Sequence, residues 1–233
     1  MHRATLATLV LAATAGTSIG DVMLPAPGRG EWRPLTFRKV PRATAYEPVT
    51  ADGVAAIRAA SDCSASALYL PVEGIVDLAD TPRLSWRWRI TRGLSMADER
   101  VKAGDDFAAR VYLMFEFDWD RASLAARLRH GVGERLYGEK IPGGAINYVW
   151  THGEPAGSHW DNPFARESKM LSLGQGPLEE WRTEDVDVAA DYRRLFGNPP
   201  PKLLGLALMT DSDNSCQRAE AYYADFRFHR PAE

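Results

Sequence analysis

The sequence predicts an all-β protein, a two-sheet antiparallel β-sandwich of the jelly-roll type with one or two short helices. Apolar and polar residues alternate in many short segments, and a period of two is typical of strands with one buried face. Turns separate these segments, and the chain holds 19 Gly and 15 Pro among its 233 residues. A helical pattern is present at only two places, which favours a sandwich or barrel over alternating strands and helices.

Strands are expected wherever this alternation is found. In chain order they are Leu35–Val40, Thr44–Thr50, Gly53–Ala59, Ala67–Pro71, Leu84–Thr91, Phe107–Phe117, Ala145–Thr151, Lys169–Leu173, Arg182–Val188, Lys202–Thr210 and Ala219–His229. Turn residues lie between these segments. Many short strands joined by turns can form two antiparallel sheets that pack face to face.

Three of these strands show the alternation most clearly, because every second side chain points to the same face of a strand. The apolar faces of the first two contain Leu84, Trp86, Trp88 and Ile90, and Phe107, Ala109, Val111, Leu113, Phe115 and Phe117. The opposite face of the second is mixed and contains Ala108, Arg110, Tyr112, Met114 and Glu116. In the last strand, Tyr222, Ala224, Phe226 and Phe228 alternate with Ala221, Tyr223, Asp225 and Arg227.

Two helices are expected. In Asp120–Arg129, Asp120 is placed as the N-cap ahead of apolar residues at helical spacing. Asp191–Phe196 ends at Gly197 and Pro199, two residue types that commonly follow a helix.

The first residues indicate export. Residues 1–20 resemble a secretory signal peptide, with Arg3, an apolar run from Ala4 to Ala15 and small residues up to Gly20. The run is shorter than the roughly 20 apolar residues that cross a bilayer, so an ordinary first helix is the remaining alternative. Residues 21–31 are expected to be a linker and residues 32–233 a single β-sandwich domain. We expect a periplasmic or secreted protein whose mature part has no transmembrane segment.

The chain has two cysteines, Cys63 and Cys216. An oxidising compartment permits a disulfide between them, and two separate buried thiols are the alternative. Both interpretations stay open at the level of sequence.

The net charge and the absence of three catalytic or nucleotide-binding motifs make several classes of function less favoured. There are 28 Lys and Arg against 31 Asp and Glu, a formal net charge of -3, so no basic patch predicts a nucleic-acid partner. The chain has no nucleophile elbow, no phosphate-binding loop and no dinucleotide fingerprint. Serine hydrolases, nucleotide hydrolases and nicotinamide enzymes are therefore disfavoured. The oligomeric state stays open.

Acidic residues gather at expected strand ends. Asp106 comes before one strand, whereas Asp211, Asp213 and Asn214 follow another. Asp106 with Asp211 or Asp213 is a candidate catalytic pair for cleaving a glycosidic bond, which needs two facing carboxyl groups. Asp211, Asp213 and Asn214 are candidate calcium ligands, since calcium prefers oxygen. Turn formation, in which Asp and Asn bond to nearby backbone N–H groups, is the alternative.

Aromatic and polar residues form a second candidate site, for binding carbohydrate. Aromatic rings can stack on sugar rings while polar groups bond to hydroxyls. The candidate ligand-binding residues are Arg110, Asn147, Tyr148, Trp150, Tyr223 and Asp225. Core packing is the alternative for the aromatic residues. For Asp225 the alternative is a structural ion pair with Arg110 or Arg87.

Four segments resemble a known family. Gly104–Tyr112, Ile146–Trp150, Met209–Asn214 and Ala221–Phe228 are similar to the bacterial exported family called domain of unknown function 3047, and the resemblance runs from about Trp32 to His229. It implies no particular activity. Tyr223–Phe228 also resembles the last strand of jelly-roll carbohydrate-binding modules, which commonly hold a structural calcium nearby.

Three functions follow as hypotheses. The first is an exported jelly-roll protein that binds a glycan through an aromatic and acidic groove. The alternatives are a hydrolase of glycosidic bonds that uses the paired Asp residues, and a non-catalytic structural protein of the envelope.

Overall fold

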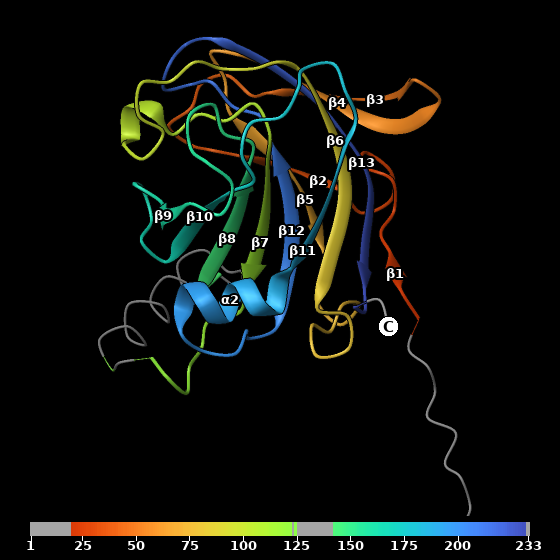
Figure 1. Ribbon diagram of the computed structural model, residues 1–233, viewed down its shortest axis with the longest axis vertical. Coiled ribbons are helices and arrows are strands. Elements are labelled where there is room, and N and C mark those ends of the chain that lie inside the picture. The colour runs from red at the N-terminus through yellow and green to blue at the C-terminus, as the bar shows by residue number, and fades with distance from the viewer. Residues whose placement is uncertain (1–19, 123, 125–141, 232–233) are drawn as a thin grey trace, which may run out of the picture.

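The computed structural model describes residues 20–122, 124 and 142–231. The predicted signal peptide and most of the predicted helix Asp120–Arg129 lie outside these residues. The described chain forms two packed β-sheets, so the predicted β-sandwich is confirmed (Figure 1).

The two sheets are built from strands that are far apart in sequence. One, the six-stranded sheet, has the order β11 (Arg182–Asp187), β6 (Arg83–Arg92), β13 (Arg218–His229), β4 (Val54–Asp62) and β3 (Ala45–Ala51), with β1 (Val22–Met23) also on β13. The other, the seven-stranded sheet, has the order β2 (Arg33–Thr36), β5 (Ser66–Pro71), β12 (Leu203–Met209), β7 (Arg110–Phe115), β8 (Gly144–Val149), β10 (Ser168–Ser172) and β9 (His159–Asp161). The pair β8 and β10 is parallel, and the other pairs are antiparallel.

The core lies between the sheets and contains the predicted apolar faces. In β6 buried and half-buried residues alternate along most of the strand. The Trp86 ring meets the Trp88 ring edge-on at 5.3 Å and stacks on the Phe226 ring at 6.4 Å. Burying aromatic side chains of this size is a large part of the hydrophobic stabilisation of a domain.

One short helix closes an end of the sandwich (Figure 1). Helix α2 runs from Val188 to Phe196, and its N-cap is Asp187, whose side chain accepts a hydrogen bond from the Ala190 amide at 2.8 Å. The Tyr192 ring packs on Phe115 at 4.6 Å. The helix therefore begins one turn earlier than predicted, because the capping residue is Asp187. A short 3-10 helix, η1, spans Lys102–Gly104.

Two boundaries differ from the prediction. The expected linker contains β1, whose Val22 and Met23 pair with β13. The expected strand Phe107–Phe117 begins only at Arg110. Phe107 therefore leaves the inner apolar face and packs with Val149 and Met170 on the outside of the seven-stranded sheet.

Among the described helices, none has the length and apolar character that crossing a bilayer requires.

Candidate functional site

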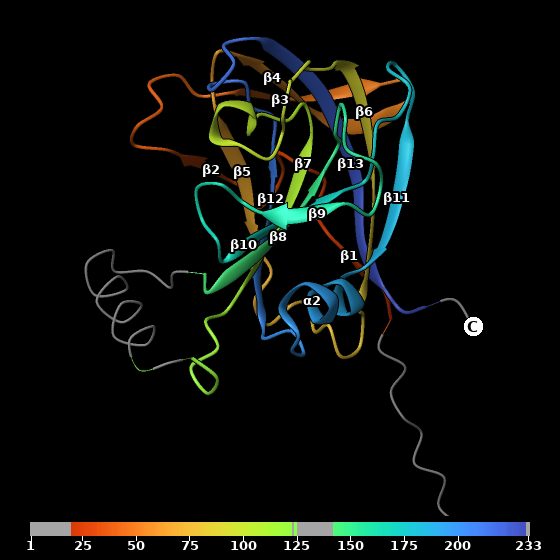
Figure 2. The ribbon, with the colours of Figure 1, turned by 60° about the vertical axis from the view of Figure 1, so that its left-hand side comes forward.

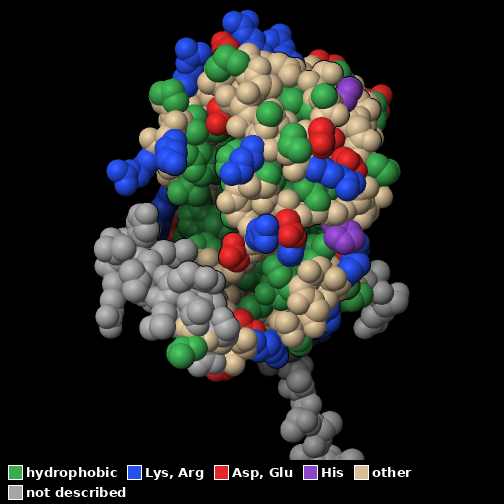
Figure 3. Space-filling view, turned by 90° about the vertical axis from the view of Figure 1, so that its left-hand side faces the viewer, with side chains coloured by type: hydrophobic (Ala, Val, Ile, Leu, Met, Phe, Trp, Pro, Cys, Tyr) green, Lys and Arg blue, Asp and Glu red, His purple; other side chains and the backbone are tan. Residues whose placement is uncertain are grey.

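The outer face of the seven-stranded sheet carries a row of side chains that point away from the core. Leu206 and Leu208 of β12 are in the core, so their neighbours along the strand face outward. The strand register places the outward residues in one row, which consists of Tyr69, Ala207, Tyr112 and Asn147. Figure 3 views the molecule from this side and shows a hollow lined by hydrophobic side chains.

Three outward side chains on this face are half-buried. We call them the tyrosine face: Tyr69 of β5, and Tyr112 and Met114 of β7. They belong to a small apolar cluster with buried Ala207 and other residues, separate from the main core. Ala207, which has a small side chain, lies between the two tyrosines in the strand register, and both tyrosines are half-buried. The tyrosine face is therefore an aromatic surface in contact with solvent.

Tyr69 is held by a close contact with the backbone. A Cβ atom added to Gly205 would lie 2.1 Å from Cε2 of Tyr69, so the ring occupies the space that a side chain at this position needs. The Tyr69 hydroxyl donates to the carbonyl oxygen of Leu204 at 3.4 Å. Glycine is required here by the close approach of the ring.

Tyr112 is connected to a buried ionic cluster. Its hydroxyl accepts a hydrogen bond from Nη1 of Arg110 at 3.1 Å. Burial raises the pKa of Tyr112 above its ordinary value, so the hydroxyl keeps its proton at neutral pH. Among the described residues this hydroxyl has no acceptor for that proton, which leaves it available to a ligand oxygen.

Arg110 is the centre of the buried cluster, with only 2% of its surface exposed. Its Nε donates to Oδ1 of Asp211 at 2.8 Å, and its Nη2 bonds to Oδ2 of Asp211. The same Nη2 donates to the carbonyl oxygen of Asp105 at 2.9 Å. The ring centre of Phe107 lies 4.8 Å from the guanidinium carbon and covers it. This guanidinium is therefore fixed on all sides.

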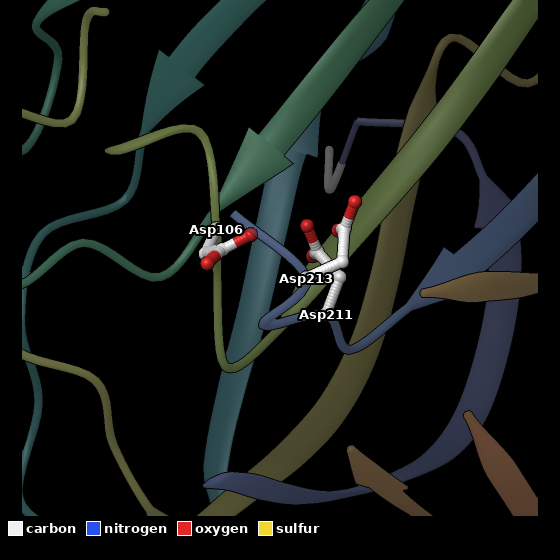
Figure 4. A group of neighbouring side chains, drawn as sticks. All are labelled: Asp106, Asp211 and Asp213. Atoms are coloured by element: carbon white, nitrogen blue, oxygen red, sulfur yellow. The ribbon is translucent and has the colours of Figure 1, made fainter. Parts of the chain in front are cut away.

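Asp106 organises the turn after β12. It accepts hydrogen bonds from the Asn214 amide at 3.2 Å, from Nδ2 of Asn214 at 2.9 Å and from the Ser215 amide at 2.6 Å. Asp106, Asp211 and Asp213 each place one carboxylate oxygen within 4.8 Å of the others (Figure 4). The fold thus brings these predicted residues together, one from the segment before β7 and two from the segment after β12.

Burial argues against the predicted catalytic pair, Asp106 with Asp211 or Asp213. Asp106 and Asp211 are each only 1% exposed, and both carboxylates already accept hydrogen bonds from Arg110 or the turn. A general acid or nucleophile has to reach the glycosidic oxygen or carbon directly. Asp213 is half-buried, but it has no accessible carboxyl partner among these three. The cluster is a structural one.

Two of the three predicted calcium ligands, Asp211, Asp213 and Asn214, already have N–H partners or present an N–H group, although Asp106, Asp211 and Asp213 lie close enough together to hold an ion. Calcium takes six to eight oxygen ligands. The carboxylate of Asp211 is bonded to Arg110 by both oxygens, and Nδ2 of Asn214 is the atom turned toward Asp106. N–H donors therefore occupy both oxygens of Asp211, and Arg110 supplies positive charge beside these carboxylates.

The predicted sugar platform is also wrong. Asn147, Tyr148 and Tyr223 have no exposed surface, and Trp150 is 3% exposed. The Tyr148 hydroxyl donates to Oδ2 of Asp191 at 3.0 Å, and the Tyr223 hydroxyl donates to the carbonyl oxygen of Met209 at 2.7 Å. Rings and amides in the interior cannot contact a sugar. The alternative for the aromatic residues, core packing, is confirmed.

Asp225 forms a structural ion pair with Arg87, which was the alternative to a role in ligand binding. It sits where the register of β13 against β6 shifts, with a positive φ of 56°, a conformation that Asp tolerates better than most residues. Nε of Arg87 donates to its Oδ2 at 2.6 Å. Asp225 lies on the six-stranded sheet, on the opposite side from the tyrosine face.

We expect the buried cluster to make stability depend on pH. Desolvation raises the pKa of Asp211 to about 8, and the nearby charges of Asp106 and Asp105 add to the shift, although Arg110 opposes it. An aspartate in an unfolded chain titrates near ~4. Between these values the folded protein holds a proton that the unfolded chain has released, so this contribution to stability is lost as the pH rises.

The measurement is a series of melting temperatures for the wild-type protein and the Asp211→Asn variant, which cannot titrate at this position. We expect the wild-type advantage over the variant to shrink from about pH 5 to about pH 8. An advantage that grows over this range would contradict the assignment.

A family model covers most of the chain. Residues 30–227 match the family described as "Protein of unknown function (DUF3047)". The chain belongs to the DUF3047 family. The family resemblance seen in the four sequence segments is therefore confirmed. No curated protein matches the sequence.

Solved structures similar to this DUF3047 protein include carbohydrate-binding modules and glycosidases. A family 11 carbohydrate-binding module from Clostridium thermocellum, in complex with a β-1,3-1,4-mixed-linked tetrasaccharide, is 8% identical with a TM-score of 0.44, over 93% of this chain and 99% of that one. A family 30 module of a Clostridium thermocellum cellulosomal cellulase is 12% identical with a TM-score of 0.43, over 91% and 99%. A family 11 xylanase from Neocallimastix patriciarum is 9% identical with a TM-score of 0.32, over 91% and 94%. Such a likeness does not show what this chain binds.

Sequence reasoning missed the tyrosine face of this DUF3047 protein. Tyr112 and Met114 stand on the mixed face of the predicted strand Phe107–Phe117, and Tyr69 alternates with Leu68 and Leu70 in Ala67–Pro71. The sequence signal that could have indicated this surface is an aromatic residue on the less apolar face of each of these two strands.

Proposed function

We propose that this protein binds a glycan on the tyrosine face, without cleaving it. The observation that supports this most directly is the pair of half-buried rings, Tyr69 and Tyr112, on one outer sheet face. Aromatic rings offer flat apolar surface to the C–H faces of sugars, and a phenol hydroxyl can bond to a sugar oxygen. The free proton of the Tyr112 hydroxyl supplies such a bond.

Binding without cleavage is favoured by the state of the carboxylates. Asp106 and Asp211 are buried and bonded to N–H donors. They shape the end of the tyrosine face through Arg110 and do not face a ligand. A recognition role needs only the rings and their polar neighbours.

We also propose that the protein acts in an exported space. The disulfide between Cys63 and Cys216 supports this, since such bonds persist in oxidising compartments. The signal-peptide pattern of residues 1–20 supports it independently. Recovery of the protein in the periplasmic or culture fraction of its host, lacking residues 1–20, is the expected result, and a cytoplasmic full-length chain would contradict it.

Glycan-array screening followed by titration calorimetry tests the binding proposal. We expect Tyr69→Ala to weaken binding of the array hits about tenfold or more, because central aromatic contacts often contribute more than ~1 kcal/mol. Gly205→Ala should weaken binding as well, since its new Cβ displaces the Tyr69 ring without removing it. Tyr112→Phe isolates the contribution of the hydroxyl.

The matched control is Tyr222→Ala. Tyr222 is a half-buried tyrosine on β13, in the other sheet. Its removal should leave glycan affinity unchanged. Binding of no glycan at all would favour the structural envelope role, and full affinity in Tyr69→Ala would move the site away from the tyrosine face.

A further inference from the structure

A short turn beside the tyrosine face carries two positive charges. The turn follows β2, and the Val40 amide closes it by donating to the carbonyl oxygen of Phe37 at 3.0 Å. Phe37 and Val40 pack in the same apolar cluster as the tyrosine face. Between them, Arg38 and Lys39 are exposed. The loop that leaves β2 projects from the sheet in Figure 2. The turn is thus anchored to this face with its two cations in solvent.

A third cation lies on the edge strand of the same sheet. Arg33 of β2 is opposite Tyr69 in the strand register, and two thirds of its side chain is exposed. Its contact with Glu31 is long, at 3.8 Å, and both partners are largely exposed, so this contact neutralises little charge. In Figure 3, Lys and Arg side chains stand along one side of the hollow.

On the outer face of the six-stranded sheet, two arginines form ion pairs with acidic side chains. There Arg58 pairs with Glu220 and Glu47, and Arg89 pairs with Asp52 at 2.9 Å and Glu179 at 2.7 Å. By contrast, Arg38 and Lys39 have no ion-pair partner within the part of the chain that the structure describes. Arg58 and Arg89 are thus neutralised on that sheet, whereas the two cations of the turn beside the tyrosine face are not.

The three buried aspartates around Arg110 do not cancel this charge. Asp105, Asp106 and Asp211 are at most 4% exposed. They lie around Arg110 and the turn after β12. Their negative charge is already shared with that guanidinium, and they are out of reach of a surface cation.

We infer that the glycan bound on the tyrosine face is acidic, a polysaccharide with carboxylate or sulfate groups, and that Arg38, Lys39 and Arg33 contact those groups. This inference rests on the proposed function. Guanidinium groups bind carboxylate and sulfate oxygens with two parallel hydrogen bonds. Sugar rings stack on the tyrosines while the anionic groups reach the adjacent cations. Complementary charge of this kind sets which partner is chosen.

The test compares acidic polymers with neutral counterparts of the same backbone. Polygalacturonate is paired with its fully methyl-esterified form, and dextran sulfate with dextran. We expect at least one acidic polymer to bind about tenfold more tightly than its neutral counterpart. Raising the NaCl concentration from about 0.05 to about 0.5 M should weaken only the acidic polymer, because salt screens exposed charges.

Substitutions in the turn test whether its two cations are responsible for the preference for an acidic polymer. The double variant Arg38→Gln with Lys39→Gln should lose the preference for the acidic polymer and keep its melting temperature, since both residues are exposed in a turn. The control is Arg92→Gln, because Arg92 is exposed, lies on β6 of the other sheet and has no ion-pair partner among the described residues. It should bind like the wild-type protein.

The outcomes distinguish this inference from the proposed function. Equal binding of acidic and neutral polymers overturns the inference and leaves the proposed function standing. Binding of no polymer and of no glycan on the array removes both. A single-stranded DNA oligonucleotide is a third probe: if it binds as tightly as the acidic polymer and Tyr69→Ala has no effect on either, the surface is a general polyanion site and the inference is wrong.

Discussion

Replacing Arg110 by Met is expected to lower the free energy of unfolding by about 3 to 5 kcal/mol, the usual cost of breaking a buried ion pair from one side. Arg110 donates to both oxygens of Asp211 and to the carbonyl oxygen of Asp105. In the variant, Oδ2 of Asp211 stays buried without its donor. Oδ1 of Asp211 and the carbonyl oxygen of Asp105 keep only long bonds, from the Phe107 amide at 3.4 Å and from Nδ2 of Asn214 at 3.3 Å. Methionine fills most of the aliphatic volume, so the loss comes from electrostatics and not from a cavity.

Urea denaturation at about pH 9 measures this loss where Asp211 is ionised. The control is Arg92→Met, an exposed arginine on the other sheet, which should change stability by less than about 0.5 kcal/mol. A second variant, Arg110→Met with Asp211→Leu, should recover part of the loss because it leaves no unpaired carboxylate at position 211. A loss below about 1 kcal/mol in the single variant would show that the pair matters little to the fold.

Removing the disulfide is the other large effect that we expect. Cys63 and Cys216 are 153 residues apart in sequence, and closing so long a loop restricts the unfolded chain strongly. Cys63→Ala with Cys216→Ala should lower the free energy of unfolding by about 3 to 5 kcal/mol. The bond also joins β4 to the turn before β13, next to the segment that holds Asp211 and Asp213.

Urea denaturation of the oxidised protein, the reduced protein and the double Ala variant checks this prediction. Reduced wild-type protein serves as the control for the loss of the side chains themselves, because it keeps both sulfur atoms. We expect reduced and variant proteins to unfold at similar urea concentrations, both well below the oxidised protein. Coinciding curves for oxidised and reduced protein would refute the expected contribution.

Much of the fold could be predicted because strand formation leaves a local pattern. Leu84, Trp86, Trp88 and Ile90 alternate with polar residues, and β6 buries those four. Such a pattern depends only on which side of a strand consecutive residues face. The start of α2 was missed by one turn because Asp187 and Asp191 are both suitable caps, and packing of Val188 against the sheet selects the first.

The candidate site could be predicted only in part. Asp106, Asp211 and Asp213 do meet, as expected of residues at the ends of neighbouring strands. Their role was predicted wrongly because it depends on Arg110, which is buried among them. The sequence left both a binding role and core packing open for Tyr148 and Trp150. A strand buried on both faces, as β8 is, gives no alternation from which to tell its two sides apart.

The sequence by itself determined the class of fold, the positions of the main strands and membership of the family, since these depend on local alternation, turn residues and motifs. Tertiary structure alone decided which tyrosines reach solvent and which carboxylate neutralises Arg110. The reason is distance along the chain: Arg110 and Asp211 are 101 residues apart. Only the packing of β7 beside β12 brings the side chains of Arg110 and Asp211 together in the interior, and it leaves Tyr69 and Tyr112 half-buried on the outer face of the same sheet.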